Sequence, residues 1–145
     1  MNKINWEDYF FSIVDLIAKR SSCLKMQVGA VIVENNQILS TGYNGPASGI
    51  KHCDICTRID MAPSERREWC PAVHAEINAI LLAAKKGVSV NNSSLYCKYF
   101  PCSYCLSCLI TAGIKEVIYE IDYEDVLNKS ILLDSNMIVK RRNVG

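Results

Sequence analysis

Two short fragments of the sequence carry residues that can bind a metal ion and move protons. They are HAE at 74–76 and PCSYC at 101–105. One imidazole and two thiolates fill three of the four tetrahedral positions of Zn²⁺ and balance its charge, which leaves one position for water. A carboxylate beside that water can take its proton and pass it to a substrate. The predicted zinc ligands are His74, Cys102 and Cys105, and the predicted general acid and base is Glu76.

Each fragment stands at the start of a predicted helix. The helical runs cover 74–86 and 102–112, and a glycine suited to the left-handed cap follows each of them. Residues two apart on a helix point to different sides, so His74 and Glu76 can serve one centre only if it lies beyond the first turn. The two cysteines are three apart and share a face, and a helix N-terminus favours the thiolate. The two helix ends are therefore expected to face one ion.

Taken singly, these residues have ordinary explanations. A histidine at a helix start is commonly a cap or core residue, the glutamate is commonly solvated, and CxxC can be a redox pair or half of a structural zinc site. Cys108 extends the pattern to CxxCxxC, but it winds away from the other two, and iron–sulfur clusters generally take four cysteines. Cys97 and Cys108 are predicted to be small buried side chains. The two fragments together favour catalysis.

The remaining pattern predicts the scaffold that positions these helices. The expected elements are a first helix capped by Asn5, strands at 28–33, 37–43, 95–98 and 116–119, and beyond Tyr123 a further helix and a strand near 137–140. The first two strands form a hairpin, and the next two enclose a helix in a parallel βαβ unit with a right-handed crossover. The sequence thus predicts an α/β protein with a mixed sheet of about five strands and helices on both faces.

Composition limits the classes of protein that fit. A chain of 145 residues is long enough for one domain with a real core, here taken as 1–145. The opening residues resemble neither a signal peptide nor a membrane span, and a net charge of +1 gives no broad attraction to nucleic acid. We expect a cytoplasmic protein that binds neither membranes nor nucleic acid. In that compartment eight cysteines favour metal binding over disulfides.

With these residues placed, the sequence resembles the deoxycytidylate (dCMP) deaminase family over nearly its whole length. The matching stretches are VGAVIV at 28–33, GYNG at 42–45, HAE at 74–76 with NAI at 78–80, PCSYC at 101–105 and AGIKEVI at 112–118. The resemblance implies a three-layer α/β/α sandwich of the cytidine deaminase type. It also implies zinc-dependent hydrolysis of dCMP to dUMP and ammonia in the supply of thymidylate.

The same resemblance implies contacts for the substrate. Asn44 matches an asparagine that hydrogen-bonds the sugar, and Tyr123 matches an aromatic residue beside the pyrimidine. Lys25 matches a basic position and is the expected partner of the 5′-phosphate, with a solvated surface lysine as the alternative. Ala75, between the two site residues of HAE, is a further expected contact.

Many members of this family are homohexamers that dCTP activates and dTTP inhibits, with Mg²⁺ accompanying the triphosphate. This chain departs from the pattern at Pro46, which follows GYNG directly where the family usually has one residue between. The regulatory expectation is therefore open. Some viral relatives also accept dCTP, so a bifunctional dCMP/dCTP deaminase is the alternative function, and a viral enzyme would act in the host cytoplasm.

A second group of cysteines lies in and near the long segment 44–72. Its members, with one histidine, are Cys23, His52, Cys53, Cys56 and Cys70. So long a connection normally needs something to order it. Some members of the family hold a second, non-catalytic zinc, and a closed tetrahedral site here would supply folding energy. We expect this second zinc, with reduced, buried thiols as the alternative.

Two rival functions use the same zinc residues. A tRNA or single-stranded DNA deaminase would need a basic, aromatic-rich groove, whereas only the short run at 140–142 is noticeably basic. A non-enzymatic zinc module, such as an accessory protein of DNA uptake, would have no need for Glu76. Both are ranked below a mononucleotide deaminase.

Overall fold

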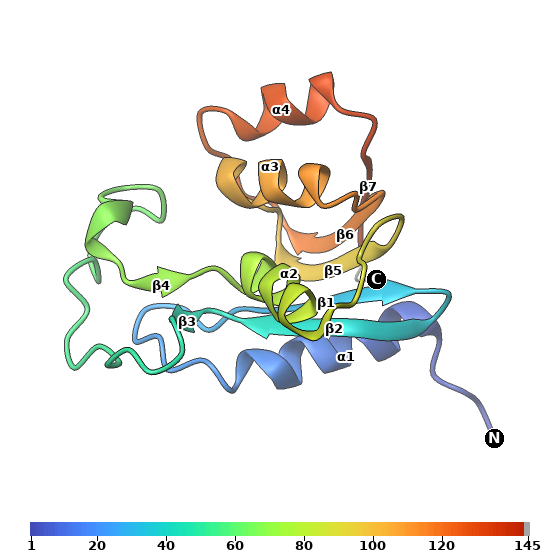
Figure 1. Ribbon diagram of the computed structural model, residues 1–145, viewed down its shortest axis with the longest axis horizontal. Coiled ribbons are helices and arrows are strands. Elements are labelled where there is room, and N and C mark those ends of the chain that lie inside the picture. Colours follow the sequence, from blue (N-terminus) through green and yellow to red (C-terminus); the bar gives the residue numbers. More distant parts are fainter. Residues whose placement is uncertain (144–145) are drawn as a thin grey trace.

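A mixed five-stranded sheet forms the centre of this computed structural model, which describes residues 1–143 (Figure 1). The strands are β1 (Gly29–Glu34), β2 (Gln37–Tyr43), β5 (Ser94–Tyr99), β6 (Glu116–Ile121) and β7 (Ile138–Arg141). They lie in the order β2-β1-β5-β6-β7. β1 runs antiparallel to both of its neighbours, while β5, β6 and β7 are parallel. The hairpin and the parallel βαβ unit predicted from the sequence are both present.

Helices cover both faces of this sheet (Figure 1). They are α1 (Trp6–Ala18), α2 (Ala75–Lys86), α3 (Ser103–Thr111) and α4 (Asn128–Asp134). α1 lies on one face, α2 and α3 lie on the other, and α4 packs against α3. The prediction of a three-layer α/β/α sandwich is therefore confirmed. None of the helices in residues 1–143 has the length and apolar character needed to cross a membrane.

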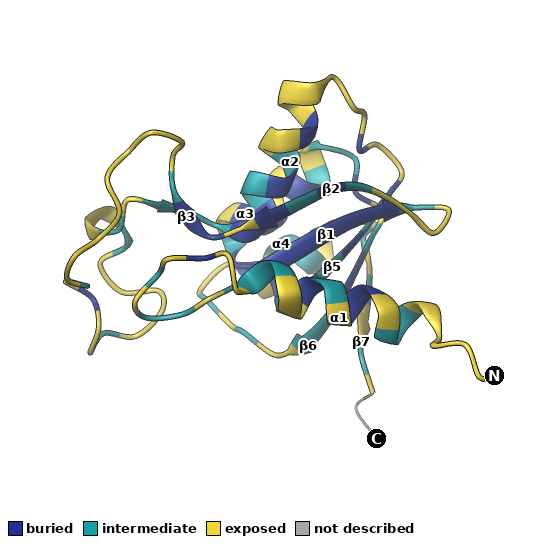
Figure 2. Cartoon of the chain, turned by 90° about the horizontal axis from the view of Figure 1, so that it is seen from below, coloured by how far each residue is buried: buried dark blue, intermediate teal, exposed yellow. Residues whose placement is uncertain are grey.

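β1 is buried on both faces, which explains its place inside the sheet. Ala30 and Ile32 belong to the core beneath α2 and α3, whereas Val31 and Val33 pack against α1. Successive side chains of a strand point to opposite faces, so a strand covered on both sides needs an unbroken apolar run. Figure 2 shows this strand buried along its length, between α1 and the helices of the opposite face.

The segment between β2 and α2 contains little regular structure. It holds a two-stranded ribbon of β3 (Gly45–Pro46) and β4 (Ala72–Val73) and a short 3₁₀ turn, η1 (Arg67–Trp69). Figure 1 shows this connection extending from one end of the sheet. Its length matches the irregular stretch expected from the sequence.

The helix ends form where capping chemistry predicts them. The Asn5 side chain accepts a hydrogen bond from the backbone N–H of Asp8 at 2.8 Å. Gly87 ends α2 with φ +68°, and Gly113 follows α3 with φ +86°. His74 and Cys102 are themselves the N-cap residues, so each site helix begins one residue later than expected. Both side chains therefore leave extended backbone just outside a helix.

Gly42 allows β2 to approach α2 closely. A Cβ atom at this position would lie 2.2 Å from the carbonyl oxygen of Ala75 and 2.5 Å from the amide nitrogen of Ala79. Gly29 has the same relation to α1 on the other face, where a Cβ would lie 2.4 Å from the carbonyl oxygen of Val14. All of these atoms are backbone, so neither contact can be relieved by a side-chain rotation.

We expect Gly42→Ala to lower the free energy of unfolding by about 1–3 kcal/mol and to weaken zinc binding, because the strand must push the start of α2 away. Gly29→Ala is the matched control, since it should lower stability similarly but displace α1, which carries no site residue. Urea denaturation and zinc content check both variants. Equal loss of zinc in the two variants would contradict the prediction.

Candidate metal centre and active site

The structure brings the two sequence fragments together. The donor atoms of His74, Cys102 and Cys105 all lie within 4.8 Å of one another. His74 Nδ1 lies 3.6 Å from Cys102 Sγ and 3.3 Å from Cys105 Sγ. A nitrogen and a sulfur at ordinary zinc bond lengths and a tetrahedral angle are about 3.5 Å apart. The three side chains thus fit a zinc ion, with one coordination position left for a small molecule.

Local backbone structure places these three ligands. His74 follows β4 and precedes α2, while Cys102 follows β5 and precedes α3. Cys102 Sγ accepts a hydrogen bond from the backbone N–H of Cys105 at 3.5 Å. Backbone N–H groups at a helix start favour a thiolate. Helix capping and metal binding therefore use the same sulfur atom.

An acidic side chain anchors the start of α3. One carboxylate oxygen of Asp125 accepts a hydrogen bond from the Ser103 N–H at 2.7 Å, and the other accepts from Leu127 N–H and Asn128 N–H at 3.0 and 2.8 Å. Although partial burial raises it, these backbone hydrogen bonds hold the pKa of Asp125 below its usual value. Asp125 thus ties the cysteine-bearing helix to the start of α4.

The two ligand thiols interact strongly. Their mutual hydrogen bond lowers the pKa of Cys102 to about 3 and raises the pKa of Cys105. One thiolate and one thiol therefore share a proton at neutral pH. Because zinc binds the thiolate form, metal binding is expected to release this proton.

Glu76 lies inside the protein beside the ligands. Its side chain is only 5% exposed, and Oε2 lies 3.5 Å from Cys105 Sγ. Burial raises the pKa of this carboxyl group above its usual range. A carboxyl group in such surroundings can hold a proton and return it, which is what a general acid and base must do.

Sequence reasoning missed one basic residue at this centre. Arg67 Nη2 lies 2.8 Å from His74 Nε2, and its guanidinium lies over the ring of Tyr104, 5.5 Å from the centroid. Arg67 comes from η1 in the long connection, and nothing in its spacing separates it from Arg66. Donation to Nε2 requires that nitrogen to be an acceptor, whereas a neutral histidine that binds metal through Nδ1 carries its proton on Nε2. Arg67 and a metal ion thus favour different tautomers of His74.

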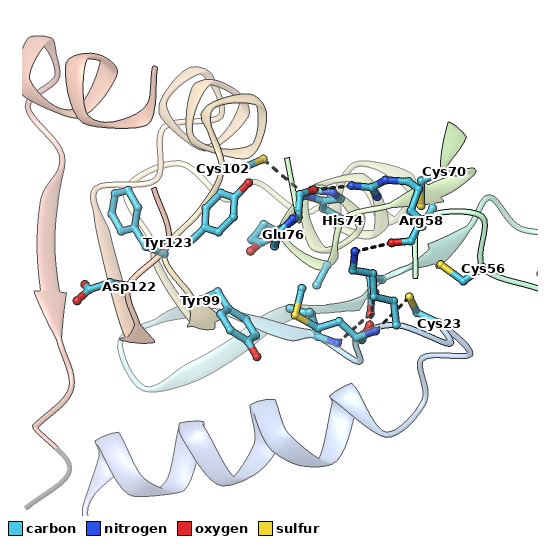
Figure 3. Close-up of a pocket in the computed structure, with 18 residues that line it drawn as sticks. Cys23, Cys56, Arg58, Cys70, His74, Glu76, Tyr99, Cys102, Asp122 and Tyr123 are labelled. Atoms are coloured by element: carbon cyan, nitrogen blue, oxygen red, sulfur yellow. Dashed lines mark hydrogen bonds between the residues drawn. The ribbon is translucent and has the colours of Figure 1, made fainter. Parts of the chain in front are cut away.

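A cavity of about 320 Å³ opens against the centre (Figure 3). Its size lies within the range of small-molecule sites. Tyr99, Asp122 and Tyr123 line it from the carboxyl ends of β5 and β6, the edge of a parallel sheet where ligands commonly bind. In Figure 3, Arg58 lies on the other side of Glu76 from these residues.

The four expected substrate contacts all line this cavity: Ala75, Asn44, Tyr123 and Lys25. The Asn44 amide accepts from Val28 N–H and donates to the Met26 carbonyl, both at 2.8 Å, which leaves one N–H and one lone pair free. Lys25 is half-buried.

Three cysteines of the second group, Cys23, Cys56 and Cys70, line the cavity, but the group does not form a compact ligand set. Burial raises the pKa of Cys53, and the nearby Cys70, Cys56 and Cys23 raise it further, so each of these three cysteines lies within electrostatic reach of Cys53. Across residues 1–143, however, His74, Cys102 and Cys105 form the only group of three or more histidine, cysteine or acidic residues whose donor atoms all lie within 4.8 Å of one another. His52 Nδ1 instead contacts the hydroxyl group of Ser22.

Of the two cysteines predicted to be buried, Cys97 and Cys108, only one is buried. Cys97 is fully buried in β5, as predicted. The prediction of a buried Cys108 is wrong, because this thiol lies on the exposed side of α3. The buried side of that helix is formed instead by Cys105, Leu106 and Leu109.

Comparison with known proteins decides the family. Residues 4–121 match the family described as the cytidine and deoxycytidylate deaminase zinc-binding region. The chain belongs to this family. The match covers both site fragments, and together with the His/Cys₂ geometry it supports Zn²⁺ as the metal.

Individual relatives agree with this assignment. The deoxycytidylate deaminase of Schizosaccharomyces pombe is 38% identical over 144 residues, which cover 97% of this chain and 44% of that protein. ComE operon protein 2 of Bacillus subtilis is 39% identical over 127 residues, covering 86% of this chain and 64% of the relative. The chain thus spans about half to two thirds of the length of these relatives.

A solved structure matches over full lengths. It is the dCMP deaminase of the cyanophage S-TIM5 in complex with dCMP and dUMP, with a TM-score of 0.81 and 29% identity over 98% of this chain and 100% of that chain. The resemblance to the dCMP deaminase family and to the cytidine deaminase fold is therefore confirmed.

Proposed function

We propose that this chain is an enzyme that hydrolyses dCMP to dUMP and ammonia with the help of Zn²⁺. The observation that carries the proposal is the arrangement of His74, Cys102 and Cys105 around one point, with Glu76 buried beside them at the wall of a nucleotide-sized cavity. Family membership and the likeness to a protein solved with dCMP and dUMP support it.

In this proposal His74, Cys102 and Cys105 hold the metal. When bound, Zn²⁺ supplies a strongly acidified water, the source of the hydroxide that hydrolysis requires. Glu76 accepts the proton of that water and delivers it to N3 of the cytosine ring. The second proton passes through the same carboxylate to the leaving amino group, so one water is consumed and one ammonia is released per turnover. Its buried position keeps bulk water from competing for these protons.

The surrounding side chains are assigned to substrate binding. The free N–H of Asn44 can donate to the sugar, and Tyr123 can pack beside the pyrimidine. Ala75 lies at the cavity wall, between His74 and Glu76 in the sequence, and can contact the ring there. Lys25 retains one N–H for the 5′-phosphate.

An ammonia-release assay on dCMP, dCTP, deoxycytidine and single-stranded DNA tests this function. We expect dCMP to be deaminated far more efficiently than deoxycytidine and the DNA to be inert. A local phosphate contact is less sensitive to salt than polymer binding, so the assay is repeated across salt concentrations. A better rate on the oligonucleotide would refute the proposal, and comparable rates on dCMP and dCTP would favour the bifunctional alternative.

The proposal extends to organisation and regulation. Residues 1–145 would act as one catalytic domain in the cytoplasm, or in the host cytoplasm if the protein is viral, and would supply a precursor of thymidylate. Assembly as a homohexamer, activation by dCTP with Mg²⁺ and inhibition by dTTP are proposed on family membership alone. Pro46, where the sequence departs from the regulatory pattern, pairs with Ala72 in the β3–β4 ribbon.

We also propose a second, structural zinc held by Cys23, Cys53, Cys56 and Cys70 or by a subset that includes His52. The support is that Cys23, Cys56 and Cys70 all lie near enough to Cys53 to raise its pKa, and that the connection holding three of these four cysteines has little apolar core. Metal analysis of the purified protein should give more than one zinc per chain. Cys70→Ser should reduce that number and leave the zinc at His74, whereas Cys108→Ser should change nothing. One zinc per wild-type chain would be the contrary result.

A further inference from the structure

Two basic side chains line one end of the cavity without an acidic partner. Lys25 is half-buried, and Arg58 is only 9% exposed. Within residues 1–143, no carboxylate forms an ion pair with either of them. Charged side chains that leave the solvent are normally paired or bound to a ligand. An unpaired couple of cations in a cavity therefore indicates that an anion binds there.

Backbone carbonyl groups fix these cations without neutralising them. Arg58 donates from Nε to the carbonyl of Glu65 at 2.8 Å and from Nη2 to the carbonyl of Pro63 at 2.5 Å. Lys25 donates to the carbonyl of Arg58 at 2.6 Å and to that of Met61. A carbonyl oxygen carries only a partial charge, so these hydrogen bonds bring no counter-charge to either side chain. Three N–H groups of the guanidinium and one of the ammonium remain for a ligand.

We infer that Arg58, together with Lys25, binds the 5′-phosphate and sets the preference for a mononucleotide. The inference rests on the proposed function. A guanidinium fits a phosphate through paired N–H groups, which a lysine cannot match. A phosphate monoester carries a charge near −2 at neutral pH, which the two cations balance, whereas a triphosphate would bring further negative charge that they do not balance. The two cations thus favour dCMP over dCTP.

The variant that tests this inference is Arg58→Gln, measured with dCMP and with deoxycytidine. We expect kcat/KM for dCMP to fall about 10- to 100-fold, mainly through KM, because a charged hydrogen bond to the substrate is lost. The ratio of kcat/KM for dCMP to that for deoxycytidine should fall by a similar factor. Inorganic phosphate should compete with dCMP in the wild type and lose most of this effect in the variant. Arg66→Gln is the matched control, since Arg66 is exposed, pairs with Glu68 and should keep the wild-type ratio.

An equal fall in kcat/KM with dCMP and with deoxycytidine would overturn the inference. It would mean that Arg58 only stabilises the connection between β2 and α2. If Arg58→Gln does not fold, Arg58→Lys replaces it, since it keeps the charge but not the paired N–H groups. An unchanged ratio in that variant would equally overturn the inference. Failure of the proposed function is distinguishable, because the wild type would then release no ammonia from dCMP.

Discussion

Glu76→Gln is expected to lower turnover of dCMP by about 10²- to 10⁴-fold while zinc and fold are retained, because the amide cannot carry the proton between water and the ring. The substitution preserves the size of a side chain that has almost no room to move. It also spares the three residues assigned to the metal. Loss of activity would then report proton transfer alone. The measurements are kcat with dCMP, zinc per chain and the thermal unfolding curve.

The matched control for this variant is Glu68→Gln, which removes an exposed carboxylate in η1. It should leave turnover and zinc content at wild-type values. Near-normal turnover in a zinc-replete Glu76→Gln protein would show that another group moves the protons, and the proposed role of Glu76 would have to be abandoned.

Cys102→Ser should release the zinc from the site and lower deamination of dCMP by at least about 10³-fold, because the acidified water disappears with the metal. A serine hydroxyl is a poor zinc ligand at neutral pH, but it can still accept the N–H bond that caps α3. α3 should therefore still form, and the variant should lose zinc and activity without losing its fold. Zinc content after dialysis and ammonia release measure the two effects.

Cys108→Ser provides the comparison on the same helix. This cysteine lies six residues after Cys102, is exposed and is not one of the proposed ligands. Its replacement should therefore alter neither the zinc content nor the activity. Full retention of zinc and activity by Cys102→Ser would contradict the proposed ligand set.

Much of the fold could be predicted because its signals are local. The unbroken apolar run of β1 requires a strand covered on both faces, and the glycines after α2 and α3 mark where those helices end. The two site fragments, at 74–76 and 101–105, could be identified from the sequence for a related reason. Each zinc ligand stands at a helix start, and the end of a helix is among the features that sequence chemistry indicates most directly.

The rest depends on distant parts of the chain. Whether Cys108 faces the core depends on which side of α3 packs against the sheet. The equal spacing of Cys102, Cys105 and Cys108 does not indicate which side that is. Arg58 and Arg67 belong to a connection without periodic pattern, so their approach to the cavity could not be read from neighbouring residues. Three-dimensional placement alone distinguishes them from Arg66, which points to solvent.

One wall of the cavity is formed at the edge of the five-stranded sheet, and another is formed by the connection between β2 and α2. Tyr99 ends β5 and Tyr123 closely follows β6, so a change of backbone at either position would disturb the five-stranded sheet. Arg58 stands in a connection outside the five-stranded sheet, where residues can be inserted, removed or exchanged without moving the strands of that sheet. Selection can therefore retune which nucleotide is accepted while the reaction itself is inherited intact. Descendants of this scaffold with altered substrate preference should have diverged first between residues 44 and 72.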